Sequence, residues 1–207
     1  MKQIAGRPVI DYIVERILTV VDREHFTIAT SDDPSDDKIE DYCRQNNLNY
    51  FRGSLQNVSK RFLDCATHFG WDYALRINGD NFFVETDAMR HIIEAAKTNK
   101  YDFLSNTHNK TFPQGMSVEA VRVAYYAEVY KQFSSEEDFE HVTYYMHQLS
   151  EGRFYFYDNT SIPGAGALKF AIDEQKDFDL CEKIFLRFDR QHTSYKMKEI
   201  IEIYKNL

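Results

Sequence analysis

Apolar residues recur at three- and four-residue spacing along much of the chain, which is the pattern of helices that bury one face. The first such stretch begins at Pro8, a residue suited to the first turn of a helix, and ends near Val21. Short β-rich runs lie between these stretches. We expect helices over 8–21, 36–46, 57–69, 86–98, 123–133, 137–149, 175–188 and 194–204, and strands over 25–30, 49–52, 71–77, 101–105, 117–122, 153–157 and 168–172.

This alternation of strands and helices favours one fold class. Strands that alternate with helices are typical of a mostly parallel sheet with helices on both faces. The rhythm changes after Gly115, where we expect the chain to cover one end of the sheet. No Pro-, Gly- or Ser-rich stretch divides the 207 residues, so the sequence predicts a single doubly wound α/β domain over residues 1–207.

Composition narrows the choice of partners. The formal net charge of -8 argues against binding to a nucleic-acid backbone, which requires clustered Lys and Arg. No apolar run is long enough to span a bilayer, so we expect no membrane insertion. The three cysteines are widely spaced and the first eight residues lack the apolar core of a signal peptide, and both features predict a cytoplasmic protein.

Two carboxylates stand at the ends of predicted strands. Asp80 ends the run Arg76-Ile77-Asn78-Gly79-Asp80, and Asp173 follows the strand predicted over 168–172. Ligands of open α/β sheets bind beyond the carboxyl ends of the strands, so neighbouring strands would let the two aspartates share one Mg²⁺. The alternative is structural, because Gly-Asp is a common turn pair and Asp173 stands where a helix N-cap belongs.

Two further groups of polar residues have the same two interpretations. Glu140, His141 and Thr143 stand beside apolar segments and would contact a hydroxylated substrate, although a lone helical histidine is usually structural. Arg52 ends a predicted strand and Ser54 follows it. Both would donate hydrogen bonds to a phosphate or a base, or else form a simple turn.

Several common chemistries lack their motifs. The chain contains neither Cys-x-x-Cys nor His-Glu-x-x-His, which disfavours a dedicated zinc site. It also lacks the Gly-x-Ser-x-Gly elbow of many hydrolases and the Walker-type loop of ATPases. The acidic strand ends therefore remain the main candidates for chemistry.

Seven short segments, read together and in order, resemble the cytidylyltransferases of the spore-coat polysaccharide type, which are related to CMP-KDO and acylneuraminate cytidylyltransferases. Each segment is weak alone, and their common order and spacing make the resemblance specific over nearly the whole chain. The matching segments are Ile4 to Pro8, Ile28 to Asp32, Phe51 to Ser54, Arg76 to Asp80, Gly115 to Glu119, Glu140 to Thr143 and Ile172 to Glu174.

The resemblance implies a nucleotide-diphospho-sugar transferase fold, which is Rossmann-like and GT-A-like. It implies that a sugar oxygen attacks the α-phosphate of CTP, with release of pyrophosphate, for surface polysaccharide or glycan synthesis. An acidic sugar is one candidate substrate, and a homodimer is one candidate assembly. By the same analogy, Asp80 and Asp173 are the catalytic Mg²⁺ ligands, Arg52, Ser54, Arg76 and Asn78 line the nucleotide side, and Glu119, Glu140, His141 and Thr143 line the sugar side.

The sequence departs from the family pattern at its beginning. Family members carry a hydrophobic strand and an Arg-x-Gly-Ser-x-Arg-Leu-Pro-Gly-Lys loop ahead of the segment that matches Ile4 to Pro8. Here Met1-Lys2-Gln3 stands directly before that segment, so we expect the central first strand and the triphosphate-binding loop to be missing. Asn81 to Phe83 and Ala171 also differ from the family's usual residues, which points to a different substrate choice.

Two alternatives to an active cytidylyltransferase follow from the sequence. One is a truncated, catalytically inactive member of the family that binds a sugar or a protein through the region from Glu119 to Thr143. The other is a glycosyltransferase of related architecture, which is disfavoured because no Asp-x-Asp pair ends a predicted strand.

Overall fold

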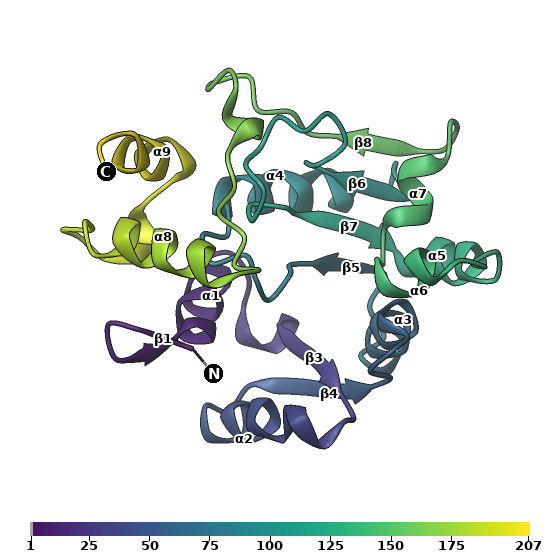
Figure 1. The fold of residues 1–207 in the computed structure, drawn as a ribbon. Coiled ribbons are helices and arrows are strands. Elements are labelled where there is room, and N and C mark those ends of the chain that lie inside the picture. Colours follow the sequence, from purple (N-terminus) through teal and green to yellow (C-terminus); the bar gives the residue numbers. More distant parts are fainter. Residues whose placement is uncertain (1) are drawn as a thin grey trace.

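Helices flank strands throughout the structure, a computed structural model that describes residues 2–207 (Figure 1). The helices are α1 (Val9–Ile17), α2 (Asp37–Gln45), α3 (Val58–His68), α4 (Thr86–Lys97), α5 (Val123–Tyr130), α6 (Glu136–Glu140), α7 (Tyr144–Gln148), α8 (Gln175–Phe185) and α9 (Met197–Lys205). The strands are β1 (Gln3–Ile4), β2 (Arg7–Pro8), β3 (Thr27–Ser31), β4 (Asn49–Gly53), β5 (Tyr73–Arg76), β6 (Phe103–Ser105), β7 (Glu119–Arg122) and β8 (Phe154–Phe156). This mixture confirms the predicted α/β class.

The main sheet has the strand order β5-β7-β6-β8. Strand β7 runs antiparallel to both β5 and β6, whereas β8 runs parallel to β6. Successive side chains of a strand point to opposite faces, and both central strands show this alternation. Phe103 and Val121 belong to one apolar cluster, and Leu104 and Ala120 belong to the other. Both faces of the main sheet are therefore covered.

The two clusters divide the helices between the two faces of the sheet. Helices α1, α4, α8 and α9 contribute buried residues to the larger cluster, in which Ile92 and Ile200 are fully buried. Helices α5 and α7 contribute to the smaller cluster, together with apolar side chains of α3. The sheet is thus a layer between two layers of helices, as the doubly wound class requires.

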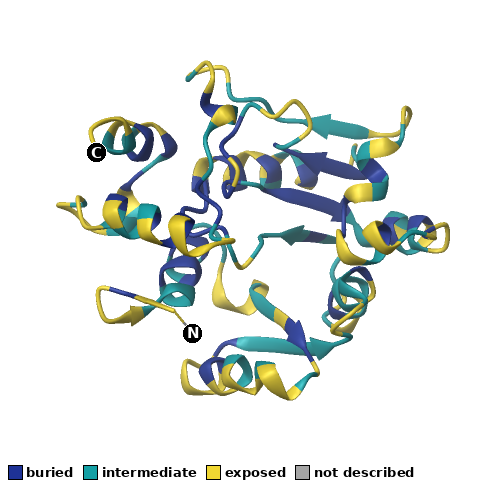
Figure 2. Cartoon of the chain, in the orientation of Figure 1, coloured by how far each residue is buried: buried dark blue, intermediate teal, exposed yellow. Residues whose placement is uncertain are grey.

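A separate parallel sheet consists of β3 and β4 alone, with Thr27 opposite Asn49 and Ser31 opposite Gly53. Among the described residues, β3 pairs only with β4 and β5 pairs only with β7, so each has one unpaired edge. Figure 2 shows the contrast in burial, since β6 and β7 are mostly dark blue and β4 is teal. A small apolar cluster that includes Cys43 and Leu48 packs against Ile28 of β3 and Tyr50 of β4.

A side chain of α3 contacts the carboxyl end of β4. Arg61 of α3 donates to the carbonyl of Ser54, just after β4, at 2.8 Å. Burial lowers the pKa of Arg61, and the charges of Asp32, just after β3, and Arg76, the last residue of β5, also act on it. The Arg61 guanidinium therefore lies beside the end of β4.

One predicted helix is wrong: residues 137–149 form two short helices instead of one. The backbone leaves the helical region at His141, which has φ of -107° and ψ of 90°, and α7 begins only at Tyr144. The break places Val142 in the core and directs the Thr143 hydroxyl to a buried carboxylate, 2.5 Å away. These two tertiary contacts outweigh the local helical pattern.

The strand predicted over 168–172 is also wrong, because the segment makes only an isolated bridge with Gln114. Its apolar residues pack as core, and the chain passes very close to Gly115. A Cβ at Gly115, where φ is +90°, would lie 2.3 Å from the backbone nitrogen of Ala171, so only glycine fits there. The first helix is shorter than predicted, ending at Ile17, and the β1–β2 hairpin was not predicted.

A buried arginine fixes the segment that follows β5. The Arg16 guanidinium donates to the carbonyls of Val84, His192 and Tyr195 at 2.7–2.9 Å, and burial lowers its pKa to about 10. Asn81, in the same segment, donates to the Ser117 hydroxyl at 2.9 Å. The turn after β5 is thereby held from both sides.

Candidate active site

The turn after β5 lies beside the segment that leads into α8. The Ile172 N–H donates to the Asp80 carbonyl at 3.1 Å, which ties the residue before Asp173 to the backbone of Asp80. The Asp173 carboxylate is close enough to raise the pKa of Asp80. The structure thus brings together the two carboxylates that the sequence singled out.

Asp80 has an unsatisfied side-chain oxygen. Its Oδ1 atom is buried and has no hydrogen-bond partner among the described residues. Burial raises the pKa of Asp80, and the charge of Asp173 raises it further. A buried carboxylate without a partner costs free energy, which a bound cation would offset. Carboxylate oxygens are also the ligands that Mg²⁺ prefers, so Asp80 and Asp173 fit a magnesium ion.

Asp173 is half-exposed and forms an ion pair with Lys169 at 2.7 Å. The same ammonium group contacts Asp177 at 2.7 Å, and these two carboxylates raise the pKa of Lys169. Asp177 also accepts hydrogen bonds from the backbone N–H groups of Asp173 and Glu174 at the start of α8. Glu174, the N-cap, and Asp177 thus form the capping box of this helix, and Asp173 is not its cap.

Glu119 is the centre of a buried hydrogen-bond network at the opposite end of the site. Its carboxylate accepts from Thr143 Oγ1 at 2.5 Å, Ser105 Oγ at 3.0 Å and Thr107 Oγ1 at 3.1 Å. His147 Nε2 lies 2.7 Å from Glu119 Oε1. Four side chains thus converge on one carboxylate at the start of β7. Ser105 is the last residue of β6, Thr107 follows β6, Thr143 precedes α7 and His147 belongs to α7.

This network keeps Glu119 ionised. Burial alone would raise the pKa of Glu119, but the hydrogen bonds from His147 and Thr143 and the charge of Arg76 lower it below its ordinary value. An Arg76 guanidinium nitrogen lies 4.0 Å from Glu119 Oε2, and the Asp80 carboxylate also acts on the pKa of Arg76. Arg76 therefore lies between the Asp80 pair and the Glu119 network.

Residues 1–203 match the model of the cytidylyltransferase family. The chain belongs to this family.

Curated and solved relatives agree with this assignment. The spore coat polysaccharide biosynthesis protein SpsF of Bacillus subtilis is 25% identical over 191 residues, which are 89% of this chain and 78% of SpsF. A cytidylyltransferase structure from Leptospira borgpetersenii is 21% identical, with a TM-score of 0.90 over 99% of this chain and 85% of that chain. A CMP:2-keto-3-deoxy-manno-octonic acid synthetase complexed with CTP is 11% identical, with a TM-score of 0.64 over 90% of each chain. These likenesses confirm the nucleotide-sugar transferase fold.

Three residues predicted on the nucleotide side of the site make contacts within the chain. Arg52 donates to the Ser31 carbonyl at 2.8 Å and pairs with Asp37 and Glu40 of α2. Ser54 Oγ accepts from the Asn57 N–H at 3.0 Å, ahead of α3. The Asn78 carbonyl accepts from the Asn81 N–H at 3.1 Å and closes a turn. These contacts are structural, and the predicted nucleotide role of the three residues remains untested.

The residues predicted on the sugar side are divided by the structure. Glu119 and Thr143 are buried and bonded to each other, whereas Glu140 and His141 are exposed and lie outside the Glu119 network. The break between α6 and α7 causes this division, because it turns Thr143 inward and leaves the end of α6 in solvent.

Sequence reasoning missed Ser105, Thr107 and His147. Ser105 ends β6, and the rule that singled out Asp80 at the end of β5 applies equally to it. His147 stands four residues after Thr143, a spacing that places two side chains on one helical face. Both signals were present in the sequence, since a helix through 137–149 would also place Thr143 and His147 on one face.

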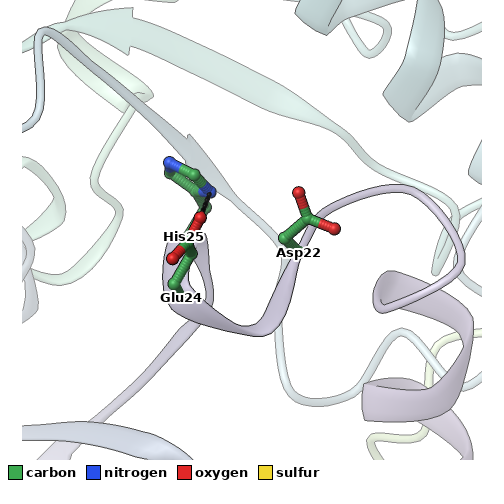
Figure 3. Close-up of side chains that lie close together, drawn as sticks. All are labelled: Asp22, Glu24 and His25. Atoms are coloured by element: carbon green, nitrogen blue, oxygen red, sulfur yellow. Dashed lines mark ion pairs between the residues drawn. The ribbon is translucent and has the colours of Figure 1, made fainter.

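Another group of potential metal ligands lies away from these residues, on the connection between α1 and β3. Asp22, Glu24 and His25 have ligand atoms within 4.8 Å of one another, and all three are exposed (Figure 3). His25 Nδ1 lies 3.7 Å from the Glu24 carboxylate. Exposed groups of this kind are common, and nothing else in the structure points to a ligand there. None of the described helices combines the length and apolar character needed to cross a membrane.

Proposed function

We propose that this cytidylyltransferase joins the CMP group of CTP to a sugar and releases pyrophosphate, in the synthesis of a surface polysaccharide or glycan. The observation that supports this most strongly is the continuous set of charges from Asp173 and Asp80 through Arg76 to Glu119. It combines a carboxylate pair suited to a cation with a rigid polar network suited to a sugar. The relatives that act on CTP and in polysaccharide synthesis support the same reaction.

In this proposal, Asp80 and Asp173 hold Mg²⁺, which supplies positive charge to a triphosphate. Arg76 adds a second positive charge between the nucleotide and the sugar. Glu119 and Thr143 orient the sugar, because their hydrogen bonds to each other fix both side chains before it binds. The sugar oxygen attacks the α-phosphate, the bond from that phosphorus to the bridging oxygen breaks, and pyrophosphate leaves.

The reaction needs no covalent intermediate on the protein, and the cysteines agree with this. All three are buried thiols, and burial raises the pKa of Cys43 and Cys65 to about 11 and that of Cys181 to about 12. Thiols of this kind are poor nucleophiles at neutral pH. Positioning and charge neutralisation carry the catalysis that we propose.

A calorimetric titration with CTP tests the proposal directly. The wild-type chain with Mg²⁺ should bind CTP, and Asp80→Asn should weaken that binding because it removes one negative ligand of the cation. Asp22→Asn, a change to an exposed carboxylate on another segment, serves as the matched control and should bind like the wild type. An absence of CTP binding by the wild-type chain would contradict the enzymatic proposal.

One observation favours a second function, the binding of a sugar or a protein without transfer. Arg52, predicted to contact the nucleotide, is already engaged by Asp37, Glu40 and a backbone carbonyl, whereas the Glu119 network is intact. A protein with this function would bind a sugar but neither bind CTP nor release pyrophosphate. The same titration, followed by a sugar titration, separates the two functions.

A further inference from the structure

The hydrogen bond between Glu119 and His147 has a defined donor and acceptor. An ionised carboxylate only accepts hydrogen bonds, and the pKa of Glu119 lies below its ordinary value. The hydrogen between His147 Nε2 and Glu119 Oε1, which are 2.7 Å apart, therefore belongs to His147. In a neutral imidazole, a hydrogen on Nε2 leaves Nδ1 bare, as a hydrogen-bond acceptor.

Nδ1 has no hydrogen-bond partner among residues 2–207, whereas Nε2 has two, Glu119 and the Thr107 hydroxyl at 3.3 Å. About a quarter of the His147 side chain is exposed, so its free side is open to solvent. The charged and titratable neighbours are Glu119 on β7, Arg76 on β5 near Glu119, and His108 after β6.

Aromatic rings hold the imidazole in place. The edge of Phe103 meets the His147 ring with centroids 5.0 Å apart and planes at 83°. His108 lies nearly parallel to His147 at 5.9 Å and stacks on Phe156 at 3.8 Å. A ring fixed on one nitrogen by a carboxylate and packed by aromatic neighbours keeps its other nitrogen in one direction, as a preorganised acceptor does.

We propose that His147 Nδ1 accepts a hydrogen bond from a sugar hydroxyl and that His147 is thereby a specificity-determining residue for a polyhydroxylated substrate. This inference rests on the proposed function for the identity of the site as a sugar site. Its chemistry is separate from the transfer step, because no proton leaves the sugar through this bond. A substrate without a hydroxyl at that position leaves Nδ1 unpaired and binds less well.

Two substitutions separate this role from a purely structural one. The amide of Gln takes the place of Nε2, so His147→Gln keeps a donor for Glu119 and loses the acceptor at Nδ1. The amide of Asn takes the place of Nδ1, so His147→Asn keeps an acceptor and loses the donor to Glu119. If His147 serves only to hold Glu119, the glutamine variant is the milder one. If our inference is correct, the asparagine variant is the milder one.

The kinetic test measures pyrophosphate release with CTP, Mg²⁺ and a panel of acidic and neutral sugars. We expect His147→Gln to raise the KM for the sugar about tenfold, the loss of one hydrogen bond, and to leave the KM for CTP unchanged. His147→Asn should retain most of the affinity for the sugar. The matched control is His91→Gln on α4. Like His147, His91 lies against an aromatic ring, that of Tyr157, and is bonded to a hydroxyl, that of Tyr155 at 2.6 Å. The reverse order of the two variants at position 147 would overturn the inference.

Nuclear magnetic resonance gives a result that does not depend on turnover. In ¹⁵N-labelled wild-type protein, we expect His147 to carry its hydrogen on Nε2, and addition of 3-deoxy-manno-octulosonic acid or a neutral hexose at high concentration to shift the Nδ1 resonance. A hydrogen on Nδ1, or no shift with any sugar of the panel, would overturn the inference. A shift without pyrophosphate release by the wild type would instead refute the proposed transfer and keep His147 as a sugar contact.

Discussion

Two carboxylates near the same edge of the main sheet, Asp80 after β5 and Glu119 at the start of β7, have opposite environments. Glu119 accepts four hydrogen bonds from side chains, and those from His147 and Thr143 lower its pKa against the effect of burial. Asp80 keeps a buried oxygen without a partner, and burial raises its pKa. The comparison suggests how to distinguish their roles: a satisfied carboxylate organises its surroundings, whereas an unsatisfied one is prepared for a ligand that the chain does not provide.

The strongest test of this contrast is the loss of the unsatisfied carboxylate. Asp80→Ala should reduce sugar transfer about a thousandfold, because it removes a ligand of the cation that neutralises the triphosphate. Initial rates of pyrophosphate release measure the effect. Asp22→Ala, on the connection before β3, should leave the rate unchanged. Full activity of Asp80→Ala would show that the cation site lies elsewhere.

Loss of the satisfied carboxylate should act mainly on the fold. Glu119→Ala leaves four hydroxyl or imidazole donors and the nearby Arg76 without their partner, so we expect the free energy of unfolding to fall by about 3 kcal/mol. Urea unfolding at pH 7, followed by circular dichroism, measures this. A change below about 0.5 kcal/mol would mean that the network contributes little to stability, as is usual for surface positions.

Magnesium should stabilise the protein through Asp80. At ten times its dissociation constant, a ligand that binds only the folded state adds about 1.4 kcal/mol to the free energy of unfolding. We expect this gain for the wild type and a much smaller one for Asp80→Asn. Thermal unfolding with increasing MgCl₂ measures both, and equal gains in the two proteins would exclude Asp80 as a ligand.

The smallest expected effect is the pH dependence of stability in metal-free buffer, where the two carboxylates should act in opposite directions. The lowered pKa of Glu119 contributes stability above the ordinary carboxyl pKa of about 4, and this is lost as the pH falls through the folded-state value. The raised pKa of Asp80 acts in the opposite direction, because it lowers the free energy of unfolding. This loss of stability is absent below about pH 4 and is complete above the folded-state pKa.

Two variants reveal these opposite signs. Between pH 3 and pH 7, Glu119→Gln should become progressively less stable than the wild type, and Asp80→Asn progressively more stable. Melting temperatures across that range, in the presence of a chelator, measure both trends. Parallel trends in the two variants would refute the contrast between the carboxylates.

The sequence predicted the carboxylate pair better than the network. Asp80 and Asp173 follow apolar runs, and the strand-end rule needs only the order of elements along the chain. Asp173 lies near Asp80 even though the run before it is not a strand, because the segment still passes beside Asp80. The environment of each carboxylate, and therefore the direction of its pKa shift, depended on contacts that the sequence does not show.

The network could not be predicted in full because a tertiary contact decides the local structure there. Val142 and Thr143 interrupt a helical pattern only because one enters the core and the other reaches Glu119. A reader of the sequence sees a helix through 137–149 and takes Glu140 and His141 as neighbours of the site. The structure exposes those two residues and places His147 in the network instead.

The unpaired edges of β3 and β5 also bear on how copies of the chain associate. They are different surfaces, so an edge-to-edge contact between β3 of one copy and β5 of another is head-to-tail and lacks the two-fold symmetry that closes a dimer. Such contacts close into a ring where the rotation between copies allows it, and otherwise extend into a filament. Association of this kind would grow with protein concentration, and a charged or proline substitution on one edge would be enough to stop it, because each link needs both edges.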